Sequence, residues 1–273
     1  INECQPIKGT IINEDSKEEF SIVHNGNIPK VTSHDTSFIK TLLEKPYTWL
    51  NKLTYLIENI PCAYSIIILT KLGMYVFRDR YGIRPLSIGE NDYNNSIGVS
   101  SETVALKDFT NIRSVKPGEI IYIENGAYNS IYQSNNIQYS LCALELVYFL
   151  RPESNIDGYN VTLVRQELGT RLAMSEYNSI ELNKNNNYIV VGIPETGKIS
   201  ARAYAKTMGF KYEQLIEKNK DIERTFIMPD NRQRQLLCRK KFIYNNISNK
   251  NIIVVDDSLV RGNVMKSIIS CLK

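Results

Sequence analysis

The stretch Asn251–Ser267, NIIVVDDSLVRGNVMKS, decides the fold of this chain. Within it, Ile252–Val255 is a short β-branched run between polar residues, a pattern typical of a buried parallel strand. Asp256 and Asp257 stand where that strand ends, and a polar loop leads into a helix predicted over Val264–Leu272. Ligands of open α/β sheets bind beyond the carboxyl ends of the strands, and a helix N-terminus suits a phosphate. The whole stretch therefore predicts a phosphate site, whereas the two aspartates alone would fit an acidic turn in solvent.

A second phosphate motif lies upstream. Tyr188–Val191 predicts a strand that leads into the loop GIPETGKIS and then into a helix. Gly192, Gly197 and Lys198 have the spacing of a nucleotide P-loop. Ile199, however, stands where a P-loop carries the Ser or Thr that ligates magnesium. These residues leave open a nucleoside-triphosphatase site and a phosphate loop of another kind.

A charged segment, EKNKDIERTFIMPDNRQRQ, follows the second motif. It contains Lys218, Asn219 and Arg224, which could contact an anionic ligand. The segment is either a solvated surface loop or a mobile lid that closes over the substrate and excludes water.

The composition is that of an ordinary globular protein. Hydrophobic residues make up 42% and charged residues 23% of the 273 residues, and the net charge of +4 is too mild to indicate nucleic-acid binding. No apolar stretch reaches the length of about 18 residues that predicts a membrane span, and residues 1–10 lack the pattern of a signal peptide. Five scattered cysteines without a CxxC spacing favour a reducing, cytoplasmic location.

The first half alternates short strands with two helices. Ser21–Asn27 predicts a strand that enters a hairpin turn at Asn25-Gly26. The same two residues could instead present a side-chain amide and a backbone N–H to an oxyanion. Ala63–Leu69 and Met74–Arg78 predict a pair of strands.

Two amphipathic helices are expected in this half. Ser33 or Asp35 would cap the first, and Trp49–Ile60 forms the second. The apolar face of the first helix comprises Phe38, Ile39, Leu42 and Leu43. Strands and helices in this order predict an α+β layered domain.

The two halves meet in a segment without a strong pattern. Asn125–Ser140 is polar and predicts a crossing between domains, which divides the chain into residues 1–140 and 141–273. Leu144–Leu150 is apolar and is expected to be buried. Val161–Tyr177 predicts a long helix. The expected apolar face of this helix comprises Leu163, Val164, Leu168 and Leu172.

Taken together, these motifs resemble the glutamine amidophosphoribosyltransferases. DDSLVRGN is similar to the ribose-phosphate motif of type I phosphoribosyltransferases, PET to their pyrophosphate loop, and ERTFIMP to the flexible loop of the amidotransferases. NECQP, HNGN, SHDTSF, RDRYGIRPL and GVSSE occur in the order of the family's glutaminase domain. The resemblance implies an α+β N-terminal-nucleophile glutaminase-like layered domain followed by an α/β type I phosphoribosyltransferase domain, each incomplete.

The resemblance also implies roles for individual residues. Asn25 and Gly26 would form the oxyanion hole, and Asp35 would bind the α-amino group of glutamine. In the second domain it implies a pyrophosphate loop of Glu195, Thr196 and Gly197; a ribose-phosphate loop of Asp256, Asp257, Ser258, Val260, Arg261, Gly262 and Asn263; and flexible-loop contacts from Lys218, Asn219 and Arg224. Thr196, Asp256 and Asp257 would hold Mg²⁺.

This sequence departs from the family pattern at several positions. Residue 1 is Ile1, whereas the family's nucleophile is a cysteine at the free amino terminus, and Cys4 is not at that position. Either the chain is a fragment that lacks the nucleophile and the C-terminal part, or its glutaminase activity is lost; we expect the fragment. Lys220 and Asp221 replace the usual Arg-Tyr of the flexible loop, and Asp221 would repel a pyrophosphate. Val264 replaces a usual hydroxyl residue.

Cys142 corresponds to a cysteine that ligates a four-iron cluster in some members of the family. Such a 4Fe-4S cluster needs four thiolates. The other ligands in those members correspond to positions beyond residue 273. Core packing is the simpler role for this cysteine.

The expected function follows from the resemblance. Ammonia from glutamine would displace pyrophosphate from phosphoribosylpyrophosphate to give 5-phosphoribosylamine, the first step of de novo purine synthesis. The intact enzyme would be a glycosyltransferase with glutamine amidotransferase activity, cytoplasmic and homo-oligomeric, without nucleic-acid or membrane partners. A non-catalytic phosphoribosyl-ligand sensor on the same scaffold and a P-loop-like nucleotidase remain alternatives.

Overall fold

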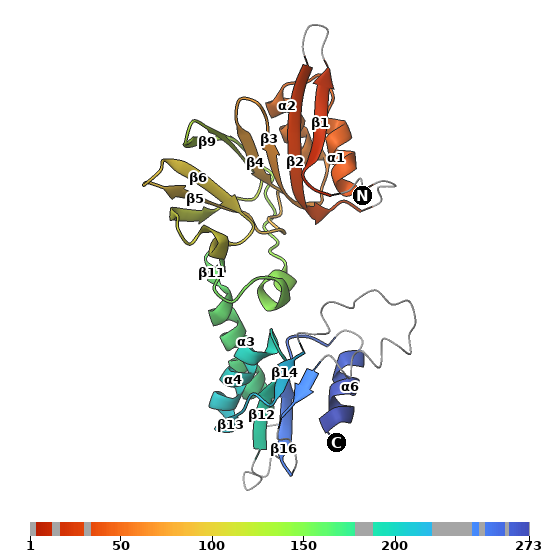
Figure 1. Cartoon of the computed structure of the whole chain (residues 1–273), viewed down its shortest axis with the longest axis vertical. Helices are drawn as coiled ribbons and strands as arrows, with labels where there is room; N and C mark the ends of the chain where they lie inside the picture. The colour runs from red at the N-terminus through yellow and green to blue at the C-terminus, as the bar shows by residue number, and fades with distance from the viewer. Residues whose placement is uncertain are drawn as a thin grey trace. The chain divides into compact units, whose positions relative to one another are not determined.

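The computed structural model describes residues 4–12, 17–29, 34–177, 188–219, 242–245, 249–259 and 262–272 (Figure 1). The chain divides into two compact units. The first comprises residues 1–145 and 149–161, and the second comprises residues 146–148 and 162–273. The predicted domains 1–140 and 141–273 stay a prediction.

The described part of the first unit contains two large antiparallel sheets and a short hairpin. The larger has the order β1-β2-β3-β4-β8-β9 and the smaller the order β6-β5-β7. Their strands are β1 (Ile7–Ile12), β2 (Lys17–Asn27), β3 (Ala63–Leu69), β4 (Met74–Arg78), β5 (Ser87–Asn91), β6 (Ser96–Ser100), β7 (Thr110–Ser114), β8 (Glu119–Glu124) and β9 (Ala127–Gln133). The helices are α1 (Asp35–Leu43), α2 (Trp49–Asn59) and the short η1 (Thr103–Leu106).

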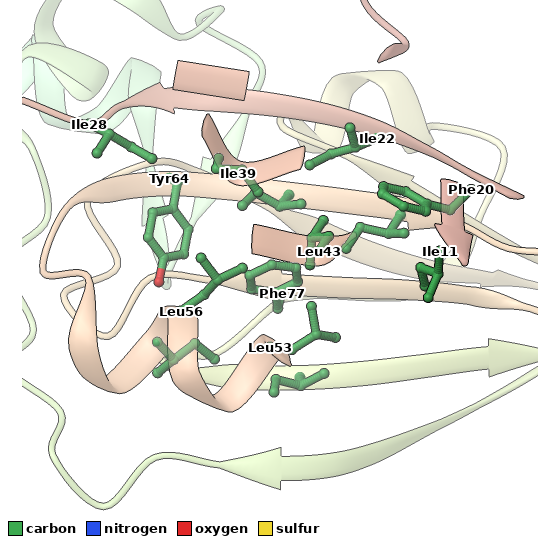
Figure 2. Packing of buried hydrophobic residues seen from close by; sticks show 14 residues of the cluster. Ile11, Phe20, Ile22, Ile28, Ile39, Leu43, Leu53, Leu56, Tyr64 and Phe77 are labelled. Carbon is green, nitrogen blue, oxygen red and sulfur yellow. The ribbon is translucent and has the colours of Figure 1, made fainter. Parts of the chain in front are cut away.

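Alternation along the strands builds a separate core on each face of the larger sheet. Ile66 of β3 lies opposite Phe77 of β4, and both belong to the cluster that α1 and α2 cover. Figure 2 shows part of this cluster, whose members include Ile22, Ile39, Leu43, Leu53, Leu56 and Phe77. The next pair along the ladder, Ile67 and Val76, packs instead with Ile88 of the smaller sheet. The described residues therefore form three layers, helices on sheet on sheet, and confirm the α+β prediction.

Three sequence predictions in this unit are wrong. Asn25 and Gly26 do not form a hairpin turn, because β2 stays paired with β3 as far as Asn27. Asp35 is not a cap but the first residue of α1, where His34 is the N-cap and makes no side-chain cap bond. Ser33 lies outside the described residues. The segment predicted to cross between domains contains β9, which pairs with β8.

Residues 145–161 also differ from expectation. The apolar run at Leu144–Leu150 is not buried throughout: it contains a single π-helical turn, Glu145–Phe149, in which Tyr148 and Phe149 are 52% and 56% exposed. A hairpin of β10 (Asn155–Ile156) and β11 (Tyr159–Asn160) follows. Its turn uses Asp157 and Gly158 at φ angles of 50° and 86°, the left-handed region that Asp tolerates and Gly favours.

The second unit is an α/β sheet with helices on both faces. Parallel strands β12 (Tyr188–Gly192), β13 (Lys211–Tyr212) and β16 (Asn251–Val255) have the order β13-β12-β16. Helix α4 (Gly197–Met208) covers the face that carries Val190, whereas α6 (Asn263–Leu272) covers the face that carries Val191. A ribbon of β14 (Ile216–Lys218) and β15 (Phe242–Tyr244) packs beside α6. The α/β prediction is thus confirmed for the described residues.

The apolar face predicted for α3 (Val161–Glu176) is wrong. Leu163, Leu168 and Leu172 are exposed by 64%, 43% and 41%. The buried positions lie four residues apart instead, at Arg165, Gly169 and Ala173. Apolar periodicity therefore identified the helix but not the side that packs.

Close packing against α4 explains why α3 packs through the side that carries Gly169. A Cβ atom on Gly169 would lie 2.1 Å from the carbonyl oxygen of Ser200, so only glycine fits there. The Ser200 hydroxyl donates a hydrogen bond of 2.9 Å to the carbonyl oxygen of Arg165. The two helices approach through small residues and a backbone contact, for which leucines are too large.

Candidate functional site

The two predicted phosphate loops leave the sheet from neighbouring strands. β12 and β16 run parallel, with Gly192 opposite Val255 at their carboxyl ends. A Cβ atom on Gly197 would lie 2.9 Å from the carbonyl oxygen of Val255 and 3.2 Å from the Cα atom of Asp256. Glycine therefore allows the start of α4 to approach the acidic end of β16.

Side chains of the two loops are directly bonded. The Thr196 hydroxyl donates a hydrogen bond to Oδ2 of Asp257. Oδ1 of Asp257 accepts from the Ser258 hydroxyl at 2.5 Å, and the Asp257 N–H donates to Oδ1 of Asp256 at 2.9 Å. The structure thus joins Thr196 to the consecutive residues Asp256, Asp257 and Ser258, about sixty positions further along the sequence, in one site.

Several predicted site residues cannot be placed. Val260, Arg261, Arg224, Lys220 and Asp221 lie outside the described residues, as do the side chains of Asn263 and Val264. Gly262 has a φ of 69°, which suits glycine, and α6 begins at the next residue. Lys218 ends β14, and Asn219 follows it. The flexible-loop contacts therefore stay predictions.

The oxygen atoms at this strand end fit a magnesium ion. Mg²⁺ prefers hard oxygen ligands and usually takes one or two carboxylates together with phosphate oxygens of the substrate. Asp256, Asp257 and Thr196 offer two carboxylates and a hydroxyl. Among the described residues, no group of three His, Cys, Asp or Glu could hold a metal ion without further ligands. This donor set therefore suits an ion that arrives with a phosphate ligand.

Cys142 does not fit an iron–sulfur cluster in the described part of the chain. Its thiol is free and half-buried, and the residues described around it supply no group of metal-binding side chains. Such a cluster needs four thiolates.

The predicted glutamine-site residues gather at the end of β2. Asn25 and Gly26 lie in the ladder opposite Ser65 and Tyr64. The Asp35 carboxylate reaches the same strand end, where its Oδ2 accepts from the Ile28 N–H at 2.9 Å. The structure thus brings the predicted oxyanion residues and the predicted amino-group ligand close together.

A polar network that the sequence did not reveal supports this strand. The Gln5 side-chain amide donates a hydrogen bond of 2.9 Å to the backbone carbonyl oxygen of His24. It also accepts one of 2.5 Å from the backbone N–H of His24. Ile7 pairs with Ile22, so Gln5 stands two residues further along the same ladder and continues it with a side chain. His24 Nδ1 lies 3.2 Å from the Thr36 hydroxyl oxygen. The segment that carries Asn25 and Gly26 is held from two sides.

The His24 imidazole predicts a pH dependence of stability. Burial lowers the pKa of His24, the Arg84 charge lowers it further, and Asp35 opposes both. The neutral imidazole is therefore favoured in the folded state. Its contribution is fully present above about pH 6.5, the unfolded pKa, and is lost as the pH falls below that value.

Between pH 7.5 and 5.5, we expect the free energy of unfolding to fall less for His24→Gln than for the unmodified chain. The measurement is urea unfolding followed by fluorescence of Trp49, the chain's single tryptophan, which stacks on Tyr75 at 5.3 Å in the first unit. His34→Gln is the matched control, because His34 is the other histidine and is exposed. Equal pH slopes for His24→Gln and the unmodified chain would contradict the prediction.

Cys62 is poorly suited to act as a nucleophile. Burial raises the pKa of its thiol, and the carboxylates of Asp35 and Asp79 raise it further. The thiolate is the reactive form of cysteine. At neutral pH this side chain is protonated and unsuited to attack an amide.

The motifs RDRYGIRPL and GVSSE bind the segment that follows the sheets. Arg84 pairs with Glu145 at 2.7 Å, and Arg78 pairs with Asp157 at 2.9 Å. Glu102 accepts hydrogen bonds from the Arg151 N–H at 2.7 Å and from a nearby serine hydroxyl at 2.8 Å. Sequence reasoning gave these charged residues no function, and the structure shows them binding Glu145, Arg151 and Asp157 within the first unit.

These observations define the class of the chain. Its second unit is an α/β unit consistent with the phosphoribosyltransferase fold, with an acidic strand end joined to a hydroxyl-bearing loop. Its first unit is an α+β layered unit.

Comparison with known proteins gives the particular relationship. The chain is 32% identical to the amidophosphoribosyltransferase of Bacillus subtilis over 93% of its length and 32% identical to that of Homo sapiens over its whole length. The solved structure of the B. subtilis glutamine phosphoribosylpyrophosphate amidotransferase, complexed with ADP and GMP, matches 98% of the chain with a TM-score of 0.82 and 31% identity. No family model matches the chain.

The chain thus resembles amidophosphoribosyltransferases along almost all of its length. It spans 56% of the B. subtilis relative, 59% of the human relative and 61% of the solved chain. In the part of the chain that the structure describes, no helix is long and apolar enough to cross a membrane.

Proposed function

We propose that this chain carries the phosphoribosylpyrophosphate site of an amidophosphoribosyltransferase. The observation that carries the proposal is the bond from the Thr196 hydroxyl to Asp257, which joins the predicted pyrophosphate loop to the predicted ribose-phosphate loop. The resemblance to enzymes of that name along the chain supports it. The reaction is the displacement of pyrophosphate from phosphoribosylpyrophosphate by ammonia, which gives 5-phosphoribosylamine for purine synthesis.

The residues at the strand end suit this displacement. The ribose ring gains positive charge as its bond to pyrophosphate breaks, and carboxylates beside it stabilise that charge. Asp256 and Asp257 bind the ribose hydroxyls and face the developing charge. Thr196 and Ser258 orient Asp257 through its two oxygen atoms. Gly197 and its loop receive the pyrophosphate at the start of α4.

Magnesium is the expected cofactor of this site. Asp256, Asp257 and Thr196 would hold it together with the ligand's own oxygens. When bound, Mg²⁺ supplies charge neutralisation to the departing pyrophosphate.

The first unit carries a glutamine site. Asn25 and Gly26 form the oxyanion hole, and Asp35 binds the α-amino group of glutamine. The network of Gln5, His24 and Thr36 supports this proposal, because it fixes the strand that bears the oxyanion residues. The partners are glutamine and phosphoribosylpyrophosphate, and the intact protein is a homo-oligomer in the cytoplasm.

A thermal-shift titration tests the second unit. The purified chain is heated with Mg²⁺ and either phosphoribosylpyrophosphate or ATP. We expect phosphoribosylpyrophosphate alone to stabilise the chain, by about 2.7 kcal/mol at one hundred times its dissociation constant. A shift with ATP alone would favour the nucleotidase that the P-loop spacing allows. A folded chain that responds to neither ligand would contradict the proposal.

A further inference from the structure

Lys198 has no part in the site as described so far. It lies in the first turn of α4, directly after the predicted pyrophosphate loop. Its ammonium nitrogen lies 2.6 Å from Oε2 of Glu195, and the two side chains are 24% and 63% exposed. The P-loop spacing drew attention to this lysine, yet the phosphoribosyltransferase motif does not use it.

The backbone of Lys198 is fixed at the site. A Cβ atom on Gly192 would lie 2.7 Å from the Cα atom of Lys198, so the lysine packs directly against the end of β12. Its neighbour Gly197 touches the acidic end of β16. The ammonium group therefore starts from the same edge of the sheet as Asp256 and Asp257.

The end of the sheet that carries these residues is mostly acidic, and Lys198 is a positive group there that a phosphate can bind. Residues 193–198 and 255–259 carry the carboxylates of Glu195, Asp256 and Asp257, and Lys198 is the only Lys or Arg within these two described segments. Within these two segments a polyanionic ligand meets three negative charges and this one ammonium group.

The contact between Glu195 and Lys198 is suited to exchange. Ion pairs with an exposed partner contribute little, typically about 0–1 kcal/mol, because water screens them. A phosphate group carries more charge than one carboxylate, and lysine binds phosphate well as a point charge. Replacement of Glu195 by a phosphate oxygen is therefore favourable for the ammonium group.

We propose that Lys198 selects for the pyrophosphate of the ligand by exchanging Glu195 for a pyrophosphate oxygen. Glu195 holds the ammonium group in the free protein and competes with the ligand for it. This inference rests on the proposed phosphoribosylpyrophosphate site and adds a specificity residue to it.

Calorimetric titration with two ligands tests the inference. Phosphoribosylpyrophosphate and ribose 5-phosphate share the sugar and the 5-phosphate, but only the first has a pyrophosphate. In the presence of Mg²⁺, Lys198→Met should weaken phosphoribosylpyrophosphate binding by about tenfold, the effect of one charge-assisted hydrogen bond, and change ribose 5-phosphate binding less than about twofold. Glu195→Gln should strengthen phosphoribosylpyrophosphate binding, because it frees the ammonium group.

The controls separate this inference from the proposed function. Lys206→Met removes a lysine from the last turn of the same helix and should leave both affinities unchanged. Lys198→Arg keeps the charge and should retain most of the affinity. An unmodified chain that binds phosphoribosylpyrophosphate no better than Lys198→Met overturns the role of Lys198 alone, as does an equal loss for both ligands. An unmodified chain that binds neither ligand overturns the site itself.

Discussion

Replacing Asp256 and Asp257 together by Asn is expected to abolish the magnesium-dependent stabilisation by phosphoribosylpyrophosphate. Asn keeps the shape of Asp, and its single side-chain oxygen can still accept one of the hydrogen bonds that each carboxylate accepts from Thr196, Ser258 or the residue 257 N–H. It removes the two negative charges on which the magnesium ion and the ribose hydroxyls depend. The expected loss is the whole ligand effect, about 2.7 kcal/mol at one hundred times the dissociation constant.

Thermal unfolding with and without the ligand measures this loss. Glu167→Gln is the matched control, because it removes a carboxylate from α3 in the same unit, where the side chain is 57% exposed. That variant should respond to the ligand as the unmodified chain does. A double variant that keeps its magnesium-dependent shift would refute the role given to the two aspartates.

Replacing Arg78 by Met is expected to destabilise the first unit by about 3–5 kcal/mol, the cost of breaking a buried ion pair. The side chain of Arg78 is fully buried. Its guanidinium donates to both oxygens of Asp157 at 2.9 Å and to the carbonyl oxygens of Arg84, Val115 and Gly82. Met leaves the Asp157 charge and three carbonyl groups without this donor.

Urea unfolding followed by Trp49 fluorescence isolates this effect, since Trp49 lies in the first unit. Asp157→Asn in the Arg78→Met background should restore part of the stability, because it removes the uncompensated charge and Asn tolerates the φ of 50° at that position. Lys17→Met breaks an exposed pair with Glu19 in the same unit and should change stability by less than about 0.5 kcal/mol. A loss for Arg78→Met as small as that of Lys17→Met would show that the buried pair does not hold residues 154–161 in place.

Local patterns predicted the secondary structure of this chain well. The strands at Ala63–Leu69 and Met74–Arg78 have the predicted bounds, and the run at Ile252–Val255 is β16. Each is a dense β-branched or aromatic run between turn residues, so the residues adjacent in sequence suffice to specify the strand. The same holds for the two helices of the first unit, whose apolar residues recur at helical spacing.

Local sequence patterns gave wrong predictions where the conformation or packing face of a segment depended on contacts with a segment distant in the sequence. Asn25-Gly26 has the composition of a turn, yet β3 pairs with it and keeps it extended. The leucines of α3 form an apolar stripe, yet the helix packs through Gly169 because the backbone of α4 comes too close for a larger residue. In both cases a contact far away in the sequence outweighed the local preference.

The sequence alone determined the classes of the two units and the resemblance of their motifs to amidophosphoribosyltransferases, because buried strands and phosphate loops are short and locally encoded. Only the tertiary structure decided which side chains share a site. It joined Thr196 to Asp257 through adjacent parallel strands, paired Lys198 with Glu195, and placed Gln5 against His24. The physical reason is that hydrogen bonds and ion pairs depend on distances of about 3 Å, which are set by strand order and helix packing and not by sequence spacing.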